Sequence, residues 1–115
     1  RTFCYISDAI IGYFKVLVNG KAPESYNIGT ESPEISILDL AKRCIEVGKD
    51  VLGYEVGLKF QDSSDKNYLI DNPNRRCPDI AKARLDLGYN PSISLHEGLT
   101  KSFIWYKENR SSEES

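Results

Sequence analysis

Apolar residues recur with helical spacing in four parts of this chain. Residues 9–20, AIIGYFKVLVNG, are apolar on nearly every face, and such a helix usually lies between two layers of structure. Asp8 stands directly before them, where a helix N-cap is expected. Residues 36–52 carry the second helical pattern, and the capping-box pair Ser36 and Asp39 marks its start. The first half of the chain is therefore predicted to contain two helices.

The second half carries a short helical pattern and a longer one. The short helix is predicted to begin at Pro78 or Asp79 and to end at Gly88, because proline favours a helix start and glycine a helix end. The longer helix begins at Ser94, which has a glutamate three positions later. One face of the short helix is expected to be buried through Ile80, Ala83 and Leu87.

Three short segments have the pattern of β-strands. They are FCYI at residues 3–6, SYNIG at residues 25–29 and EVGLKF at residues 55–60. Strands that alternate with helices favour an α/β fold, with short, partly parallel strands and about four helices. Three short strands cannot cover all of these helices, so the sheet is expected to continue in a part of the protein absent from this sequence.

Composition narrows the classes of partner. A chain of 115 residues, with 40% apolar and 28% charged residues, suits one globular domain. The formal net charge of −2 argues against nucleic acid or an anionic membrane as the main partner, because both attract a broad basic surface. No apolar run reaches the ~18 residues that span a bilayer, and the three cysteines match neither a disulfide framework nor a zinc site. These features predict a cytoplasmic protein with reduced thiols.

The two ends of the sequence differ in character. The chain has no methionine and starts in an apolar, strand-like run, so it is expected to be a piece of a longer protein. Residues 1–108 are predicted to form its folded region. Residues 109–115 are small, polar and charged, which is typical of a disordered tail.

Sequence signals for catalysis, metal binding and cofactor binding are missing. No glycine-rich turn of the nucleotide-binding type follows a predicted strand. His96 is the only histidine, and none of the tyrosines has a lysine four residues later. Cys4 and Cys44 are expected to be packed in the core, whereas Cys77 stands beside arginines that could lower its pKa. We therefore assign no catalytic, metal or cofactor residue to this chain.

Two adjacent arginines, Arg75 and Arg76, precede the predicted helix that begins at Pro78 or Asp79. Their guanidinium groups could bind a phosphate bidentately beside the helix N-terminus. Alternatively, one arginine pairs with Asp79 or Asp71 and the other is solvated. The residue types alone favour this second interpretation.

Asn27 is a second polar candidate, because it lies in an apolar strand pattern and precedes Gly29. An amide at the carboxyl end of a strand either clamps a neighbouring backbone or contacts a ligand. The residues alone leave both roles open.

Three ordered segments resemble the extended short-chain dehydrogenase/reductases, the enzymes that remodel nucleotide-activated sugars. RTFCYISDAI at residues 1–10 is similar to the R-x-F-x-Y-V-x-D segment of that family, and YNIGTESPEISILDLAKR at residues 26–43 is similar to its v-N-i-G segment and the following helix. NRRCPDIAKARLDLGYNPSISLHEGLTKSFIWY, residues 74–106, resembles its closing R-x-x-D and LG-[WY]-x-P segment. The nearest subgroups are the dTDP-glucose 4,6-dehydratases and the UDP-glucuronate decarboxylases.

The resemblance implies that this chain is the C-terminal, substrate-binding portion of the extended fold, without the N-terminal Rossmann domain. By motif position, Arg76 matches the arginine that grips the substrate diphosphate, and Arg1 matches an arginine that approaches the nucleotide phosphates. Asn27 matches a position near the nucleotide. Tyr5 and Asp8 match positions that we interpret as structural.

The resemblance also implies what the parent protein does. It would be an NAD-dependent 4,6-dehydratase, epimerase or decarboxylase that acts on a nucleotide sugar, binds NAD in the missing domain and forms a homodimer. This chain alone is expected to be inactive, because it lacks the glycine-rich turn and the Tyr-x-x-x-Lys motif. The alternatives are a stand-alone nucleotide-sugar-binding module and a protein-interaction module, both without catalysis.

Overall fold

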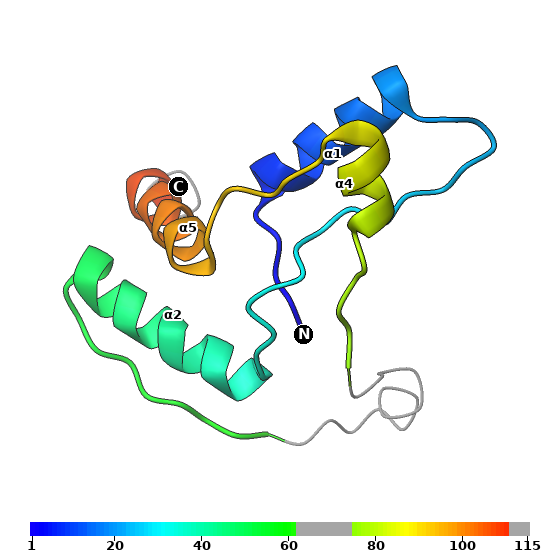
Figure 1. The fold of residues 1–115 in the computed structure, drawn as a ribbon. Helices are drawn as coiled ribbons and strands as arrows, with labels where there is room; N and C mark the ends of the chain where they lie inside the picture. Colours follow the sequence, from blue (N-terminus) through cyan, green and yellow to red (C-terminus); the bar gives the residue numbers. More distant parts are fainter. Residues whose placement is uncertain (62–74, 111–115) are drawn as a thin grey trace.

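The structure, a computed structural model, describes residues 1–61 and 75–110 and contains four helices within these ranges. Figure 1 shows them as two pairs, in which α1 packs with α4 and α2 packs with α5. Each corresponds to a helix predicted from the sequence. Their bounds are Ile6–Asn19 for α1, Ile37–Leu52 for α2, Ala81–Leu87 for α4 and Leu95–Asn109 for α5. The last helix therefore includes the first residue of the predicted tail, and residues 111–115 lie outside the described residues.

A small apolar core lies between α1, α4 and the extended segment around Ile28. Ile80 is fully buried just before α4, and Tyr89 is 1% exposed just after it. Ala83 and Leu87 are buried as well, which confirms the predicted face of the short helix. The half-buried residues that pack against these four are Val16, Tyr26 and Ile28.

Local caps set the helix ends as predicted. The Ser36 hydroxyl accepts a hydrogen bond from the Asp39 N–H at 3.0 Å, and the Ser94 hydroxyl accepts one from the Glu97 N–H at 3.1 Å. Gly88 ends α4 in the left-handed conformation, with a φ of 63° that suits glycine. These three positions could be predicted from the sequence because each capping residue contacts backbone groups only a few positions away along the chain.

Asp8 has a different role from the predicted N-cap. The first helix, α1, begins at Ile6 with Tyr5 as its N-cap, so Asp8 lies in its first turn. The Asp8 side chain is 3% exposed and accepts hydrogen bonds from the Ser92 N–H at 3.1 Å and the Ile93 N–H at 2.9 Å. The capping prediction was wrong because the loop between α4 and α5, distant in sequence, uses the carboxylate instead. Asp8 is nonetheless structural, as the resemblance implied.

The predicted α/β fold was wrong, because residues 1–61 and 75–110 contain no β-strand. Among the described residues, backbone pairing between the non-helical segments consists of isolated contacts. Arg1 and Ile35 exchange two hydrogen bonds of 2.9 Å, and the Thr2 N–H donates to the Arg76 carbonyl at 3.3 Å. A strand requires a continuous ladder with a neighbour. The apolar alternation could not supply that neighbour, and Ile6 of the predicted strand 3–6 belongs to α1.

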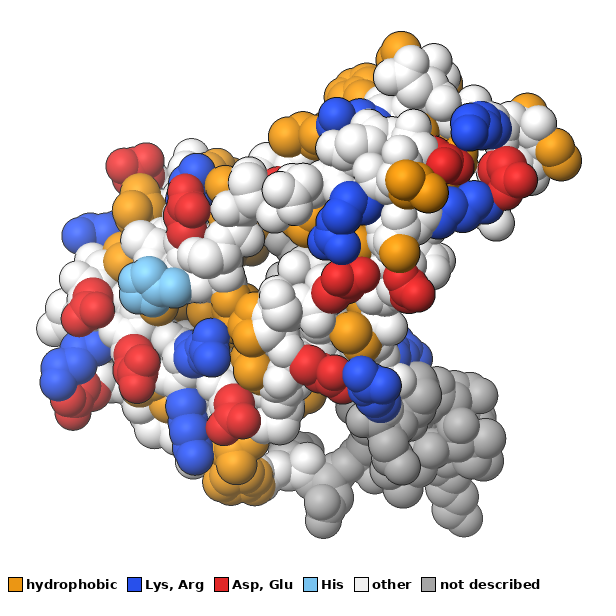
Figure 2. All heavy atoms as spheres, viewed as in Figure 1, with side chains coloured by type: hydrophobic (Ala, Val, Ile, Leu, Met, Phe, Trp, Pro, Cys, Tyr) orange, Lys and Arg blue, Asp and Glu red, His pale blue; other side chains and the backbone are white. Residues whose placement is uncertain are grey.

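Two surface features bear on the partners expected from composition. No helix within the described ranges is long and apolar enough to cross a membrane. On the face shown in Figure 2, the Lys and Arg side chains are interspersed with Asp and Glu side chains instead of forming one broad basic area. That face therefore offers no extended surface of a single charge to a polyanion.

Candidate functional site

Three segments that are distant in sequence meet at one cleft. The hydrogen bond from the Thr2 N–H to the Arg76 carbonyl joins the N-terminal segment to residues 76–78. A Cβ on Gly29 would lie 3.1 Å from the Pro78 ring, so glycine permits this close approach. The cleft has a volume of about 400 Å³, which suits a small-molecule site. Its lining residues are Thr2, Cys4, Ile28, Gly29, Thr30, Arg76, Cys77 and Pro78.

Arg76 lines this cleft directly and is exposed. A guanidinium group carries several N–H donors in a planar fork, which is the geometry that binds phosphate oxygens. The Thr30 hydroxyl donates to the Ser32 carbonyl at 2.9 Å, so its proton is already engaged. The lining side chains that can donate hydrogen bonds to an anion include the Arg76 guanidinium and the Thr2 hydroxyl.

The other two predicted site residues flank the cleft. Arg1 is half-buried and directly precedes Thr2, a lining residue. Asn27 directly precedes Ile28, and its Nδ2 donates to the Asp79 carbonyl at 3.2 Å. This contact is a backbone clamp, one of the two roles that the sequence left open for Asn27. Of the three predicted residues, Arg76 lines the cleft, and Arg1 and Asn27 are sequence neighbours of lining residues.

Arg75 pairs with Glu34, from the segment before α2. Nε and Nη2 of Arg75 lie 2.5 Å and 2.9 Å from the two carboxylate oxygens of Glu34, so the pair is bidentate. The guanidinium lowers the pKa of Glu34, and the carboxylate raises the pKa of Arg75. An ion pair for one arginine was expected, but the sequence suggested Asp79 or Asp71 as its partner. Asp71 lies outside the described residues, and the observed partner was missed because it is 41 positions away.

Glu31 is a second acidic residue that the sequence did not reveal. One of its carboxylate oxygens accepts a hydrogen bond from the Ile80 N–H at 3.0 Å, and the other lies 3.5 Å from Nη1 of Arg84. Its backbone carbonyl accepts a weak hydrogen bond from the Cys77 thiol at 3.4 Å. Glu31 therefore holds the segment between Arg76 and α4 against the segment that follows Gly29.

The start of α4 is occupied by carboxylates of the chain itself. The Ile80 N–H binds Glu31, and the Ala81 N–H binds Oδ1 of Asp79 at 2.9 Å. An anion at this helix end would have to displace one of them. The expected gain from the field of this helix is therefore already used by two carboxylates of the chain, and Arg76 is the charged residue that lines the cleft.

The surroundings of Cys4, Cys44 and His96 bear on the chemistry that the cleft can perform. Burial raises the pKa of Cys4 and of Cys44, as expected for packed thiols. His96 is exposed in the first turn of α5 and does not line the cleft. No group of three possible metal ligands occurs within the described residues. The chemistry that this cleft offers is anion binding by the Arg76 guanidinium and the Thr2 hydroxyl.

Comparison of the chain with known proteins identifies its relatives. No protein-family model matches it. The dTDP-D-glucose 4,6-dehydratase of Bos taurus is 34% identical over 111 residues, which are 95% of this chain and 30% of that enzyme. The UDP-glucuronic acid decarboxylase 6 of Arabidopsis thaliana is 34% identical over 99 residues, which are 86% of this chain and 26% of that enzyme. This chain is homologous to part of the nucleotide-sugar dehydratases and decarboxylases.

The structural comparison agrees with this homology. Crystal structures of the Bordetella bronchiseptica enzyme WbmF, one with NAD⁺ and UDP and one with NADH, match the chain with TM-scores of 0.74 and 0.73 at 28% identity. Each match covers 99% of this chain and 31% of the WbmF chain. The chain thus spans about a third of the length of the dehydratase and of WbmF. The resemblance carried by its three motifs is confirmed over nearly the whole sequence.

Proposed function

We propose that this chain is the substrate-binding part of an NAD-dependent nucleotide-sugar dehydratase, epimerase or decarboxylase, and that its cleft binds the substrate diphosphate. The observation that carries the proposal is the position of Arg76, whose side chain lines a cleft of about 400 Å³. A guanidinium suits a diphosphate because its fork donates two parallel hydrogen bonds. The names of the dehydratase and decarboxylase relatives, and the UDP bound to WbmF, support this class of ligand. Arg1 would add a second positive charge at the edge of the cleft.

Two contacts hold the backbone on either side of Arg76. On one side, Arg75 is fixed by its bidentate pair with Glu34. On the other side, Asn27 clamps the Asp79 carbonyl. Arg76 therefore loses less conformational freedom when it binds an anion than an arginine on an untethered loop would.

The remainder of the parent protein would supply NAD and the catalytic residues. This sequence has no glycine-rich turn of the dinucleotide-binding type, so NAD would bind outside it. The helix α1 offers a surface for that remainder, because Leu17 is 79% exposed and Val18 is 74% exposed. A helix that is apolar on nearly every face is normally covered by a second layer. In the proposal the NAD-binding domain forms this layer, and the chain alone is catalytically inactive.

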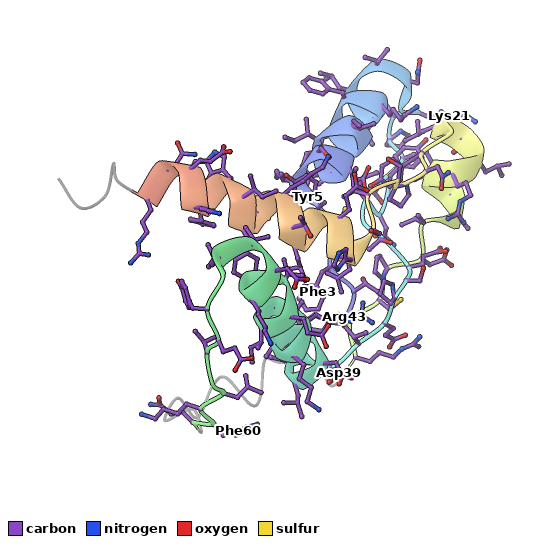
Figure 3. The ribbon with its side chains drawn as sticks, turned by 90° about the vertical axis from the view of Figure 1, so that its left-hand side faces the viewer. Phe3, Tyr5, Lys21, Asp39, Arg43 and Phe60 are labelled. Atoms are coloured by element: carbon purple, nitrogen blue, oxygen red, sulfur yellow. The ribbon has the colours of Figure 1, made fainter. Side chains whose placement is uncertain are left out.

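Isothermal titration calorimetry with UDP and dTDP tests the binding role. We expect Arg76→Ala to weaken UDP binding by about 1.5 kcal/mol, roughly tenfold, which is the low end for a hydrogen bond to a charged group because Arg76 is exposed. Arg43→Ala is the matched control, since Arg43 is an exposed arginine on α2 that does not line the cleft (Figure 3). Arg43→Ala should bind UDP as the unsubstituted chain does.

Equal UDP affinity of the two variants would contradict the role of Arg76. If the 115-residue chain shows no heat with either nucleotide, the same variants are compared in the longer polypeptide by the KM for the nucleotide sugar. Turnover of a nucleotide sugar by the 115-residue chain alone would contradict the proposed inactivity of this part.

A further inference from the structure

Two of the three cysteines, Cys4 and Cys77, line the cleft that contains Arg76. Both are free thiols and half-buried. The third cysteine, Cys44, lies on α2 and is not among the lining residues. A cleft of about 400 Å³ therefore brings together two thiols and a guanidinium.

The backbone places the two thiols on neighbouring segments. Thr2 and Cys4 are two positions apart in the segment before α1, and both line the cleft. The Thr2 N–H donates to the carbonyl of Arg76, the residue that directly precedes Cys77, at 3.3 Å. Residues 2–4 therefore lie beside residues 76–78. Because neither segment is helical, we expect both to adjust to the separation of about 3.8 Å between Cβ atoms that a disulfide requires.

Weak hydrogen bonds hold the two thiols in their present positions. The Cys77 thiol donates to the Glu31 carbonyl at 3.4 Å, and Sγ of Cys4 lies 3.9 Å from the Tyr89 hydroxyl. A thiol is a weak donor and its sulfur a weak acceptor. Both contacts can therefore be given up at small cost when either sulfur atom reacts.

We propose that the cleft is a site of thiol–disulfide exchange, where a small disulfide that carries carboxylates converts Cys4 and Cys77 into an intramolecular disulfide. In the first step the Cys77 thiolate attacks one sulfur of the small disulfide, whose S–S bond breaks and releases one small thiolate. In the second step the Cys4 thiolate attacks the Cys77 sulfur and displaces the other small thiolate. The two thiol protons of the chain pass to the released thiolates, so the chain is oxidised and the small disulfide is reduced.

Charge and burial set the order of the two steps. Burial raises the pKa of Cys4, which lowers the fraction of this thiol that is ionised. Cys77 directly follows Arg76, whose guanidinium attracts the carboxylates of the incoming disulfide. The new bond would cross the space where the substrate diphosphate is proposed to bind. This last consequence rests on the proposed function, whereas the exchange itself does not.

The chain is incubated in buffers of glutathione disulfide and glutathione, its remaining thiols are then alkylated, and mass spectrometry identifies the linked residues. We expect a disulfide between Cys4 and Cys77 that an excess of glutathione reverses. Cys4→Ser should stop at a mixed disulfide of Cys77 with glutathione, and Cys77→Ser should prevent the intramolecular disulfide. Cys44→Ser is the matched control and should be oxidised as the unsubstituted chain is.

Two reagents of different charge test the role of Arg76. Arg76→Gln should slow the reaction of Cys77 with glutathione disulfide roughly tenfold. The same variant should react with the uncharged 2-hydroxyethyl disulfide at the rate of the unsubstituted chain. Equal rates of the variant and the unsubstituted chain with glutathione disulfide would contradict the attraction of carboxylates into the cleft.

Calorimetry with UDP then separates this inference from the proposed function. The oxidised chain should bind UDP roughly tenfold more weakly than the reduced chain. Oxidation that leaves the UDP affinity unchanged would confirm the exchange and contradict the cleft as the diphosphate site. The inference is overturned if no disulfide between Cys4 and Cys77 forms at any ratio of glutathione disulfide to glutathione, or if Cys44→Ser prevents its formation.

Discussion

Replacing Asp8 with alanine would remove the link between α1 and the loop before α5. The Asp8 carboxylate is 3% exposed and binds the Ser92 N–H at 3.1 Å and the Ile93 N–H at 2.9 Å. Asp8→Ala would leave both donors without this partner, and each unsatisfied buried donor costs about 1–3 kcal/mol. Because Ser92 is exposed and water can reach it, we expect the free energy of unfolding to fall by about 3 kcal/mol, in the lower half of the combined range of about 2–6 kcal/mol.

Urea denaturation followed by circular dichroism gives this free energy. Asp39→Ala is the matched control, because Asp39 also lies in the first turn of a helix but is exposed. Both substitutions remove a negative charge from a helix N-terminus, where it contributes about 0.3–1 kcal/mol. The difference between the two variants therefore reports the contacts of Asp8 with the loop.

Asp8→Asn keeps one carbonyl acceptor and should give a loss between that of Asp8→Ala and that of the unsubstituted chain. If Asp8→Ala loses no more stability than Asp39→Ala, then the two backbone hydrogen bonds do not stabilise the fold. That result would refute the assignment of Asp8 as the connection between α1 and the loop.

Two further predictions concern packing and pH. Gly12→Ala should lower the free energy of unfolding by roughly 1–2 kcal/mol, because the new Cβ would lie 2.4 Å from Cγ2 of Ile28 and 3.0 Å from the Tyr89 ring, and this overpacking outweighs the helix propensity of alanine. A variant more resistant to urea than the unsubstituted chain would contradict this reasoning. Burial raises the pKa of Tyr89 above 10.0, so stability should be retained below pH 10.0 and lost as the pH rises above it, because the unfolded chain ionises first. In thermal denaturation above pH 10.0, the stability of Tyr89→Phe should fall less steeply with pH than that of the unsubstituted chain. Tyr106→Phe is the control, because Tyr106 is 63% exposed, and its stability should fall with pH as that of the unsubstituted chain does. If the stability of the two variants falls equally steeply with pH, the role of burial is refuted.

The helices could be predicted because their signals are local. Ser36 and Ser94 each cap a helix through the N–H of a residue three positions away. Gly88 ends α4 at the residue where the chain needs a left-handed conformation. The spacing of the apolar residues also identified the buried face of α4. None of these features depends on which other segment of the chain packs against the helix.

The fold class could not be predicted in the same way, because a strand is defined by its neighbour. Alternating apolar residues at 25–29 and 55–60 determine which side chains share a face, but they do not provide a partner for the backbone. Within the described residues, the extended segments make only isolated pairs such as Arg1 with Ile35. The alternation therefore predicted the fold class incorrectly.

The candidate site was predictable only where a motif carried it. The resemblance selected Arg76, and the structure places it in the cleft. Glu34 and Glu31, which hold the segment around Arg76, pair with residues 41 and 49 positions away. No spacing rule connects residues that are so distant in sequence, since their contact depends on how the extended segments pack together.

The exposed apolar surface of α1 bears on the proposed function. The residues of α1 are apolar on nearly every face, and α4 covers one side of this helix. The chain spans about a third of the dehydratase and of WbmF, so a domain of the parent protein can supply the second layer. If the proposed function holds, a longer polypeptide that includes the NAD-binding domain should bury Leu17, which is 79% exposed in this chain. Solvent accessibility of a label at position 17 that is equal in both polypeptides would contradict this assignment of α1.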